Sequence, residues 1–174
     1  MAQGCWLTAR MAVDSRAFRN TVGQFVTGVT VIAADIDGTI RAMTANSFTS
    51  LSLDPPLVLF CVGKNTKMGQ LIAEASGFSV NILQQDQQDL STYFAGGWKE
   101  EQPPAFTFEA WDGGPLLAGS AAAIGCNLET IYEGGDHWIV VGRVNALYRS
   151  ASAGAPLLFR SGRYATLAAP VEVP

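Results

Sequence analysis

A run of short polar side chains lies between two apolar stretches in the first third of the chain. Residues 44–53 carry hydroxyl and amide groups at Thr44, Asn46, Ser47, Thr49, Ser50 and Ser52. Groups of this kind on a rigid wall suit a flat heterocycle with carbonyl and ring-nitrogen edges. Backbone donors beside them could stabilise the negative charge that such a ring gains on reduction. The alternative is a loop whose hydroxyls bond its own backbone.

Two lysines flank a hydroxyl a few residues further on. Lys64, Thr66 and Lys67 follow an apolar stretch and precede an expected helix, for which Thr66 is a suitable N-cap. Hydroxyl and ammonium groups at a helix N-terminus form a natural phosphate site. The alternative is an ordinary solvated cap with two surface lysines.

The chain has a single histidine, His137, which follows Gly134-Gly135-Asp136. The glycines predict a hairpin turn, and this would place His137 at the rim of a barrel, where ligand contacts are common. Its expected task is binding and orientation, because hydride transfer between stacked rings needs no protein nucleophile. The alternative is a structural or surface histidine, the commoner role for a lone one.

Aromatic and cationic side chains alternate near the C-terminus, at Phe159, Arg160, Arg163 and Tyr164. Such a set could receive a stacked ring and a phosphate. The alternative is a final edge strand whose charges prevent association with other edges.

The elements that would position these segments are mostly strands. A helix is expected from Asp14 or Ser15, with Phe18, Val22 and Phe25 on one face. Further helices are expected over residues 66–75 and 84–94, and 96–104 form a long connection. Asp37-Gly38 and Gly134-Gly135-Asp136 predict the turns of two hairpins. Strands are expected over residues 26–32, 39–44, 57–62, 78–83, 106–111, 121–132 and 138–148.

This pattern predicts a mainly β protein with a few helices, closed as an antiparallel barrel. The strand over 57–62 is apolar throughout and is expected to be buried. No Gly-x-Gly-x-x-Gly turn follows a strand, so a Rossmann site is not expected. The length of 174 residues favours one domain over residues 14–168, with tails at 1–13 and 169–174.

Composition narrows the classes of partner. A net charge of -4 without any run of Lys or Arg argues against nucleic-acid binding. Charged residues make up only 15%, so we expect apolar surface in a subunit interface. Three cysteines without a Cys-x-x-Cys pair, and one histidine, argue against a zinc site and fit a cytoplasmic protein with reduced thiols. Neither a signal peptide nor a membrane span is expected.

Taken in order along the chain, these segments resemble the flavin reductase-like family, the short-chain reductase components of two-component flavin-dependent monooxygenases. The resemblance covers about residues 18–167, and its most specific stretch is TANSFTSLSLDPPLVLFCV at residues 44–62. Residues 79–83, 93–96, 135–137 and 162–164 support it. The resemblance implies an FMN-binding split β-barrel, antiparallel and Greek-key-like, that works as a homodimer.

The resemblance also implies roles for single residues. Cys61 and Val62 would lie beside the ribityl chain, and Phe94 would close over the cofactor. His137 and Tyr164 would be the catalytic residues on the nicotinamide side. The phosphate would lie near Lys64, Thr66 and Lys67. The flavin-binding wall would comprise Thr44, Ala45, Asn46, Ser47, Ser50, Ser52 and Leu53.

The activity implied is that of an NAD(P)H:flavin oxidoreductase. It would reduce FMN or FAD with NADH or NADPH and supply diffusible reduced flavin to a separate flavin-dependent oxygenase, either a monooxygenase or a halogenase. Arg160 or Arg163 would favour NADPH by holding its 2′-phosphate. The alternatives are a protein that retains FMN, as an oxidase of the pyridoxamine-phosphate type or a carrier without turnover, and a structural β-barrel dimer.

Overall fold

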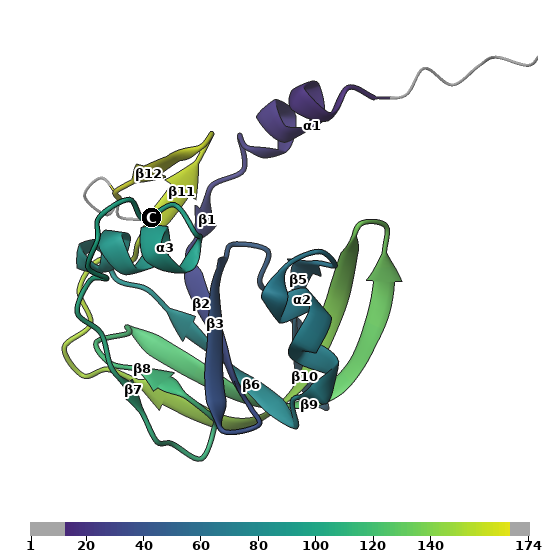
Figure 1. Ribbon diagram of the computed structural model, residues 1–174, viewed down its shortest axis with the longest axis vertical. Coiled ribbons are helices and arrows are strands. Elements are labelled where there is room, and N and C mark those ends of the chain that lie inside the picture. Colours follow the sequence, from purple (N-terminus) through teal and green to yellow (C-terminus); the bar gives the residue numbers. More distant parts are fainter. Residues whose placement is uncertain (1–12, 168–174) are drawn as a thin grey trace, which may run out of the picture.

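Seven antiparallel strands form the main sheet of the protein (Figure 1), in the spatial order β3-β2-β6-β9-β10-β5-β4. The computed structural model describes residues 13–167, so the expected tails lie outside it except for Val13. The mainly β, antiparallel architecture confirms the fold class predicted from sequence. The strands are β2 (Thr30–Ile36), β3 (Thr39–Ala45), β4 (Thr49–Leu53), β5 (Pro56–Gly63), β6 (Gly77–Ile82), β9 (Ala122–Gly134) and β10 (His137–Arg149).

The barrel is split rather than closed all the way round. Within the described residues, β3 pairs with β2 alone and β4 pairs with β5 alone, so no ladder joins β3 to β4. Residues 46–48 cross this opening without belonging to either strand. The split barrel implied by the family resemblance is therefore confirmed, whereas the closed barrel expected from the strand pattern alone is corrected to one that opens at the Ser/Thr-rich segment.

Both expected hairpins are present. Asp37 and Gly38 have φ values of 50° and 75°, as a two-residue primed turn requires, and Ile36 pairs with Thr39. Gly135 has a φ of 68° in the turn that pairs Gly134 with His137. The second hairpin therefore places His137 at the first residue of β10, next to the end of β5.

Two strand predictions need correction. The strand expected over 106–111 shrinks to β7 (Phe108–Glu109), because its partner β8 (Leu116–Leu117) offers only two residues for pairing. The strand over 57–62 exists as β5, but it is not buried throughout. Its side chains alternate, with Val58, Phe60 and Val62 in the core and the others partly exposed, because only one face lies against the core.

Two of the short helices begin at the caps expected from sequence. Asp14 caps α1 (Ser15–Val22) by accepting from the Ala17 amide at 2.7 Å, and Thr66 caps α2 (Lys67–Leu71). The expected helix over 84–94 is divided into the 3₁₀ turn η2 (Gln85–Gln87) and α3 (Gln88–Phe94). A further 3₁₀ turn, η1 (Ile72–Glu74), follows α2. In the described chain no helix is long and apolar enough to cross a membrane.

Strand β2 separates two hydrophobic clusters. Ile32 belongs to one cluster, on which Met68 of α2 packs, whereas Val31 belongs to the other, on which Leu90 of α3 packs. Figure 1 accordingly shows α2 and α3 on opposite sides of the β2–β3 hairpin. A small second sheet of β1 (Thr27–Gly28), β11 (Leu158–Arg160) and β12 (Arg163–Ala165) lies beyond α3.

Candidate functional site

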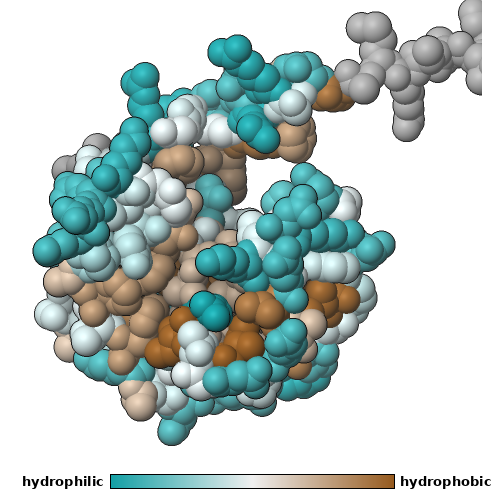
Figure 2. Space-filling view, in the orientation of Figure 1, coloured by the Kyte–Doolittle hydropathy of each residue, from teal (hydrophilic) through white to brown (hydrophobic). Residues whose placement is uncertain are grey.

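A groove of about 520 Å³ lies where the barrel opens, and three of the four sequence segments meet in it. They are the end of β3 with the crossing residues, the start of α2, and the β9–β10 turn. Figure 2 shows the molecule hollowed on this face, between the part that contains α3 and the part that contains α2. The residues lining the groove are Met43, Thr44, Ala45, Asn46, Ser47, Cys61, Gly63, Asn65, Thr66, Asp136 and His137.

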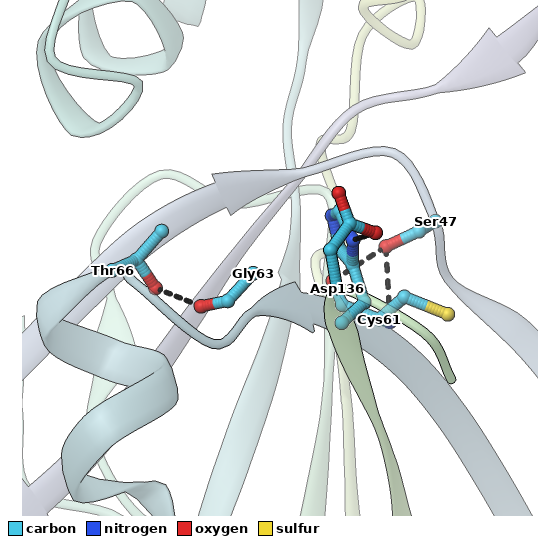
Figure 3. Close-up of polar contacts among 6 residues, drawn as sticks. Ser47, Cys61, Gly63, Thr66 and Asp136 are labelled. Carbon is cyan, nitrogen blue, oxygen red and sulfur yellow. Dashed lines mark hydrogen bonds and ion pairs between the residues drawn. The ribbon is translucent and has the colours of Figure 1, made fainter. Parts of the chain in front are cut away.

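Ser47 fastens the crossing residues to β5 (Figure 3). Its hydroxyl donates to the Cys61 carbonyl at 2.9 Å and accepts from the Cys61 amide at 3.0 Å. The β4–β5 ladder pairs Thr49 with Leu59, so this side chain extends the ladder by one step of two residues. Because the single donor of this hydroxyl is used, Ser47 holds the wall in place and has only its second acceptor position left for a ligand.

The backbone of the crossing residues is left available. Within residues 13–167, the amides of Asn46 and Ser47 donate to no backbone or side-chain acceptor. The Asn46 side chain donates to the Thr27 hydroxyl at 3.2 Å, which ties it to β1 and leaves its carbonyl oxygen free. Two unpaired donors on a fixed wall can bind the carbonyl edge of a flat ring.

Thr66 and Gly63 form the other end of the groove. The Thr66 hydroxyl donates to the Gly63 carbonyl at 2.9 Å and accepts from the Gly69 amide at 3.0 Å. A Cβ at Gly69 would lie 2.1 Å from the Gly63 oxygen, so only glycine allows α2 to pack this closely. At five residues α2 is too short for a strong helix dipole, so an anion here would depend on amide and ammonium groups.

His137 and Asp136 form a pair at the rim. His137 Nδ1 lies 2.8 Å from Asp136 Oδ1, and the two side chains are 46% and 91% exposed. The hydrogen bond from His137, together with its charge when protonated, lowers the pKa of the Asp136 carboxyl. The ring stands over Gly63, since a Cβ built there would lie 3.8 Å from His137 Nε2. Asp136 thus orients the histidine so that Nε2 faces the groove.

Several predicted site residues lie elsewhere. Lys64 points away, because its ammonium pairs with Glu133 at 3.0 Å and lies 4.4 Å from the centre of the Trp138 ring. Val62 is 1% exposed in the core and cannot offer its side chain to a ligand. Ser50, Ser52 and Leu53 belong to the edge strand β4 and do not line the groove of their own chain.

Lys67 and Phe94 line a second cavity of about 580 Å³, which we call the aromatic cavity. Phe94 lies in a cluster of rings there and does not cover the groove. The lining residues of the aromatic cavity are Ile40, Arg41, Ala42, Lys67, Met68, Tyr93, Phe94, Gly96, Phe106 and Phe108.

Tyr164 is connected to the groove through hydrogen bonds of Ser91 and Thr44. Its hydroxyl donates to Ser91 Oγ at 2.9 Å, and the Ser91 carbonyl accepts from Thr44 Oγ1 at 2.7 Å. The C-terminal hairpin therefore fixes α3 against the groove wall without lining it. Arg160 donates to Gln24 at 3.0 Å, at the end of α1, so it too lies outside the groove.

Four residues that line the groove were not predicted from the sequence: Met43, Gly63, Asn65 and Asp136. Gly63 and Asn65 flank the lysine that drew attention to their segment, and Asp136 precedes the histidine. A polar residue next to a single histidine in a turn was the available signal for Asp136. Gly63 has no side chain to draw attention, and its role follows only from the space that it leaves open.

Known proteins resemble this chain over almost its whole length. The family described as Flavin reductase like domain matches residues 22–168. The flavin-dependent monooxygenase reductase subunit HsaB of Rhodococcus jostii (strain RHA1) is 39% identical over 170 residues, which cover 95% of this chain and 85% of that protein. Flavin reductase PheA2 in its native state superposes with a TM-score of 0.84 and 42% identity, over 89% of this chain and 99% of the other. The Streptomyces globisporus C-1027 NADH:FAD oxidoreductase SgcE6, in complex with NAD and FAD fragments, has a TM-score of 0.81 and 37% identity, over 91% and 96%.

Proposed function

The chain belongs to the flavin reductase-like family, and from this membership and the groove we propose that it is an NAD(P)H:flavin oxidoreductase acting on FMN or FAD. The observation that carries the proposal is the pair of unpaired amides at Asn46 and Ser47, which the Ser47 hydroxyl holds on a fixed wall. They would donate hydrogen bonds to the carbonyl edge of the isoalloxazine ring, where negative charge grows on reduction.

The rest of the groove fits the remainder of a flavin. Gly63 leaves the space between Thr66 and His137 open, and a Cβ there would begin to fill it. Asn65 in the groove and the exposed Lys67, which lines the adjoining aromatic cavity, supply amide and ammonium groups for the ribityl phosphate. Lys64 is not needed for this task because Glu133 and Trp138 already hold it.

The chain's own contribution is to bind and orient. When both substrates are bound, the reduced nicotinamide supplies a hydride to the flavin ring, a step that needs alignment and no protein nucleophile. His137, held by Asp136 at the rim, would hold the nicotinamide. Asn46 and Ser47 are exposed, so a bound flavin can leave for a separate flavin-dependent oxygenase. HsaB, named as the reductase subunit of a flavin-dependent monooxygenase, is a relative with such a division of labour.

The test is oxidation of NADH and NADPH, followed by the loss of reduced-nicotinamide absorbance with FMN or FAD added in turn. The proposal predicts protein that is colourless after gel filtration and a rate that saturates with added flavin. Yellow protein whose rate is indifferent to added flavin would instead favour a retained prosthetic group. The same assay decides the preference between NADH and NADPH.

A homodimer is part of the proposal. No residue of α1 is buried: Phe18 and Val22 of this helix are 57% and 50% exposed, and Phe25, which follows it, is 77% exposed. On the edge strand β4, Leu53 is 94% exposed. A second copy of the chain would remove this apolar surface from water. Light scattering after gel filtration should give twice the chain mass of 18.5 kDa, whereas a monomer at micromolar concentration would contradict the dimer.

We also propose a cytoplasmic location. The support is that Cys61 and Cys126 are free thiols in the described chain, as is usual in a reducing compartment. Fractionation of cells that express the protein, with antibody detection, tests the location.

A further inference from the structure

The aromatic cavity continues the groove along the same two elements. Strand β3 lines the aromatic cavity with residues 40–42 and the groove with residues 43–45. The start of α2 does likewise, with Asn65 and Thr66 in the groove and Lys67 in the aromatic cavity. The two cavities therefore adjoin at the place where the phosphate end of a flavin would lie.

Four aromatic rings line the aromatic cavity, those of Tyr93, Phe94, Phe106 and Phe108. Phe106 is the most open of them, at 38% exposed, and its ring centre lies 5.0 Å from Phe94 and 5.5 Å from Tyr93. Phe108 packs on Phe106 at 5.8 Å. A wall of tilted rings with an open member presents faces and edges on which a further flat ring can stack.

The side chains that line the aromatic cavity carry positive charge, whereas the whole chain has a negative net charge. Arg41 and Lys67 line it, no carboxylate does so among the described residues, and neither cation forms an ion pair in that part of the chain. The whole chain carries -4. Two unpaired cations beside an aromatic wall match a phosphate joined to an aromatic base.

We propose that the aromatic cavity binds the adenosine phosphate half of FAD, and that the protein prefers FAD to FMN on this account. This inference rests on the proposed flavin site in the groove. The isoalloxazine would lie against Asn46 and Ser47, the diphosphate would pass Lys67 and Arg41, and the adenine would stack on Phe106. Phe94 then contributes to flavin binding through the adenine end, and not as a cover over the ring that is reduced.

The test compares dissociation constants for FAD and FMN, measured by fluorescence quenching, in wild type and two variants. Phe106→Leu removes the ring but keeps apolar volume, and Arg41→Gln removes one cation from an edge strand. Matched controls are Tyr132→Leu and Arg149→Gln, an exposed aromatic and an exposed arginine of β9 and β10. Stacking of a base on an aromatic ring predicts that FAD binds about tenfold more weakly to Phe106→Leu, while FMN binding stays unchanged. Arg41→Gln should show the same selectivity, and the controls should behave as wild type.

A second arm identifies the source of the adenosine. With FAD as the flavin, 5′-AMP should compete with it for binding, whereas 5′-AMP should not displace FMN. Equal affinity of the wild type for FAD and FMN would overturn the inference, as would equal losses for both flavins in the variants. A raised KM for NADH with FAD binding unchanged would assign the cavity to the nicotinamide dinucleotide and also overturn it. Turnover with FMN in the same variants shows that the fold and the proposed function persist.

Discussion

The hydroxyl of Ser47 and the backbone of Cys61 share two hydrogen bonds across the opening of the barrel, at 2.9 and 3.0 Å. The Ser47 hydroxyl thus makes the pair of hydrogen bonds that backbone groups make elsewhere in the ladder between β4 and β5. The backbone of the crossing residues is consequently free to face the groove.

Replacing Ser47 with alanine should affect stability and binding together. Ser47→Ala leaves the amide and carbonyl of Cys61 without these partners, which should lower the free energy of unfolding by about 1 kcal/mol. The loss of binding free energy for flavin should exceed this loss of stability, because the amides at residues 46 and 47 lose their fixed position. Urea unfolding and flavin titration measure the two effects, with Ser76→Ala, an exposed serine away from the groove, as control. Loss of stability with unchanged flavin affinity would separate Ser47 from the site.

A side chain at Gly63 should block the groove without unfolding the protein. The added Cβ would lie 3.4 Å from Thr66 Cγ2 and 3.8 Å from His137 Nε2, distances that the fold tolerates. The larger valine of Gly63→Val would extend into the space between them. We expect a graded loss of flavin affinity, small for Gly63→Ala and at least about tenfold for Gly63→Val. Circular dichroism should remain that of the wild type, and full flavin affinity in the valine variant would show that the flavin lies elsewhere.

His137 should matter more for the nicotinamide than for the flavin. We expect His137→Ala to raise the KM for NADH several-fold while the dissociation constant for flavin changes little. Steady-state kinetics and flavin titration give the two numbers for one preparation. Equal losses for both ligands would point to a folding defect instead.

The pair of Asp136 and His137 should be visible in an acid titration. The ordinary pKa of an aspartate carboxyl is about 3.9. In the folded protein the pKa of Asp136 lies below this value. The pair with His137 is therefore intact above about pH 4 and is lost as the pH falls through the lowered pKa. His137→Gln should move the titration midpoint of Asp136 up toward the ordinary value. Carboxyl chemical shifts in NMR spectra measure it, and an unmoved midpoint would contradict the pairing.

The two described cysteines should differ in reactivity. Burial raises the pKa of the Cys126 thiol to about 12, and partial burial raises that of Cys61 as well. Iodoacetamide at mildly alkaline pH should therefore label Cys61 slowly and leave Cys126 unmodified. Because Cys61 lines the groove, FMN should protect it. Peptide mapping by mass spectrometry resolves the sites, and labelling of Cys61 that is indifferent to FMN would contradict the flavin position.

Local signals in the sequence were sufficient for most of the fold. Asp37-Gly38 predicts its hairpin because few residue pairs adopt two positive φ values, and Asp14 and Thr66 predict helix starts because their side chains cap backbone amides. The strand at β4 was missed, because its serines and threonines lie at an edge where no apolar alternation is needed. Pairing at such an edge depends on the neighbour β5.

The sequence predicted which segments meet at the site, but not which of their side chains are available to a ligand. Hydroxyls were expected to donate to a ligand, whereas those of Ser47 and Thr66 donate to the backbone carbonyls of Cys61 and Gly63. Lys64 is kept out of the groove by Glu133 and Trp138, which are remote from it in sequence. Only tertiary structure brings such partners together.

The bonds from Tyr164 through Ser91 to Thr44 also bear on how the protein is made. Tyr164 follows Thr44 by 120 residues in the sequence, yet it supports the groove wall that contains Thr44. During synthesis the wall can receive this support only after residue 164 has left the ribosome. A ribosome that stalls before residue 164 would therefore leave a barrel whose groove wall lacks the support of the Tyr164 hydrogen bond to Ser91.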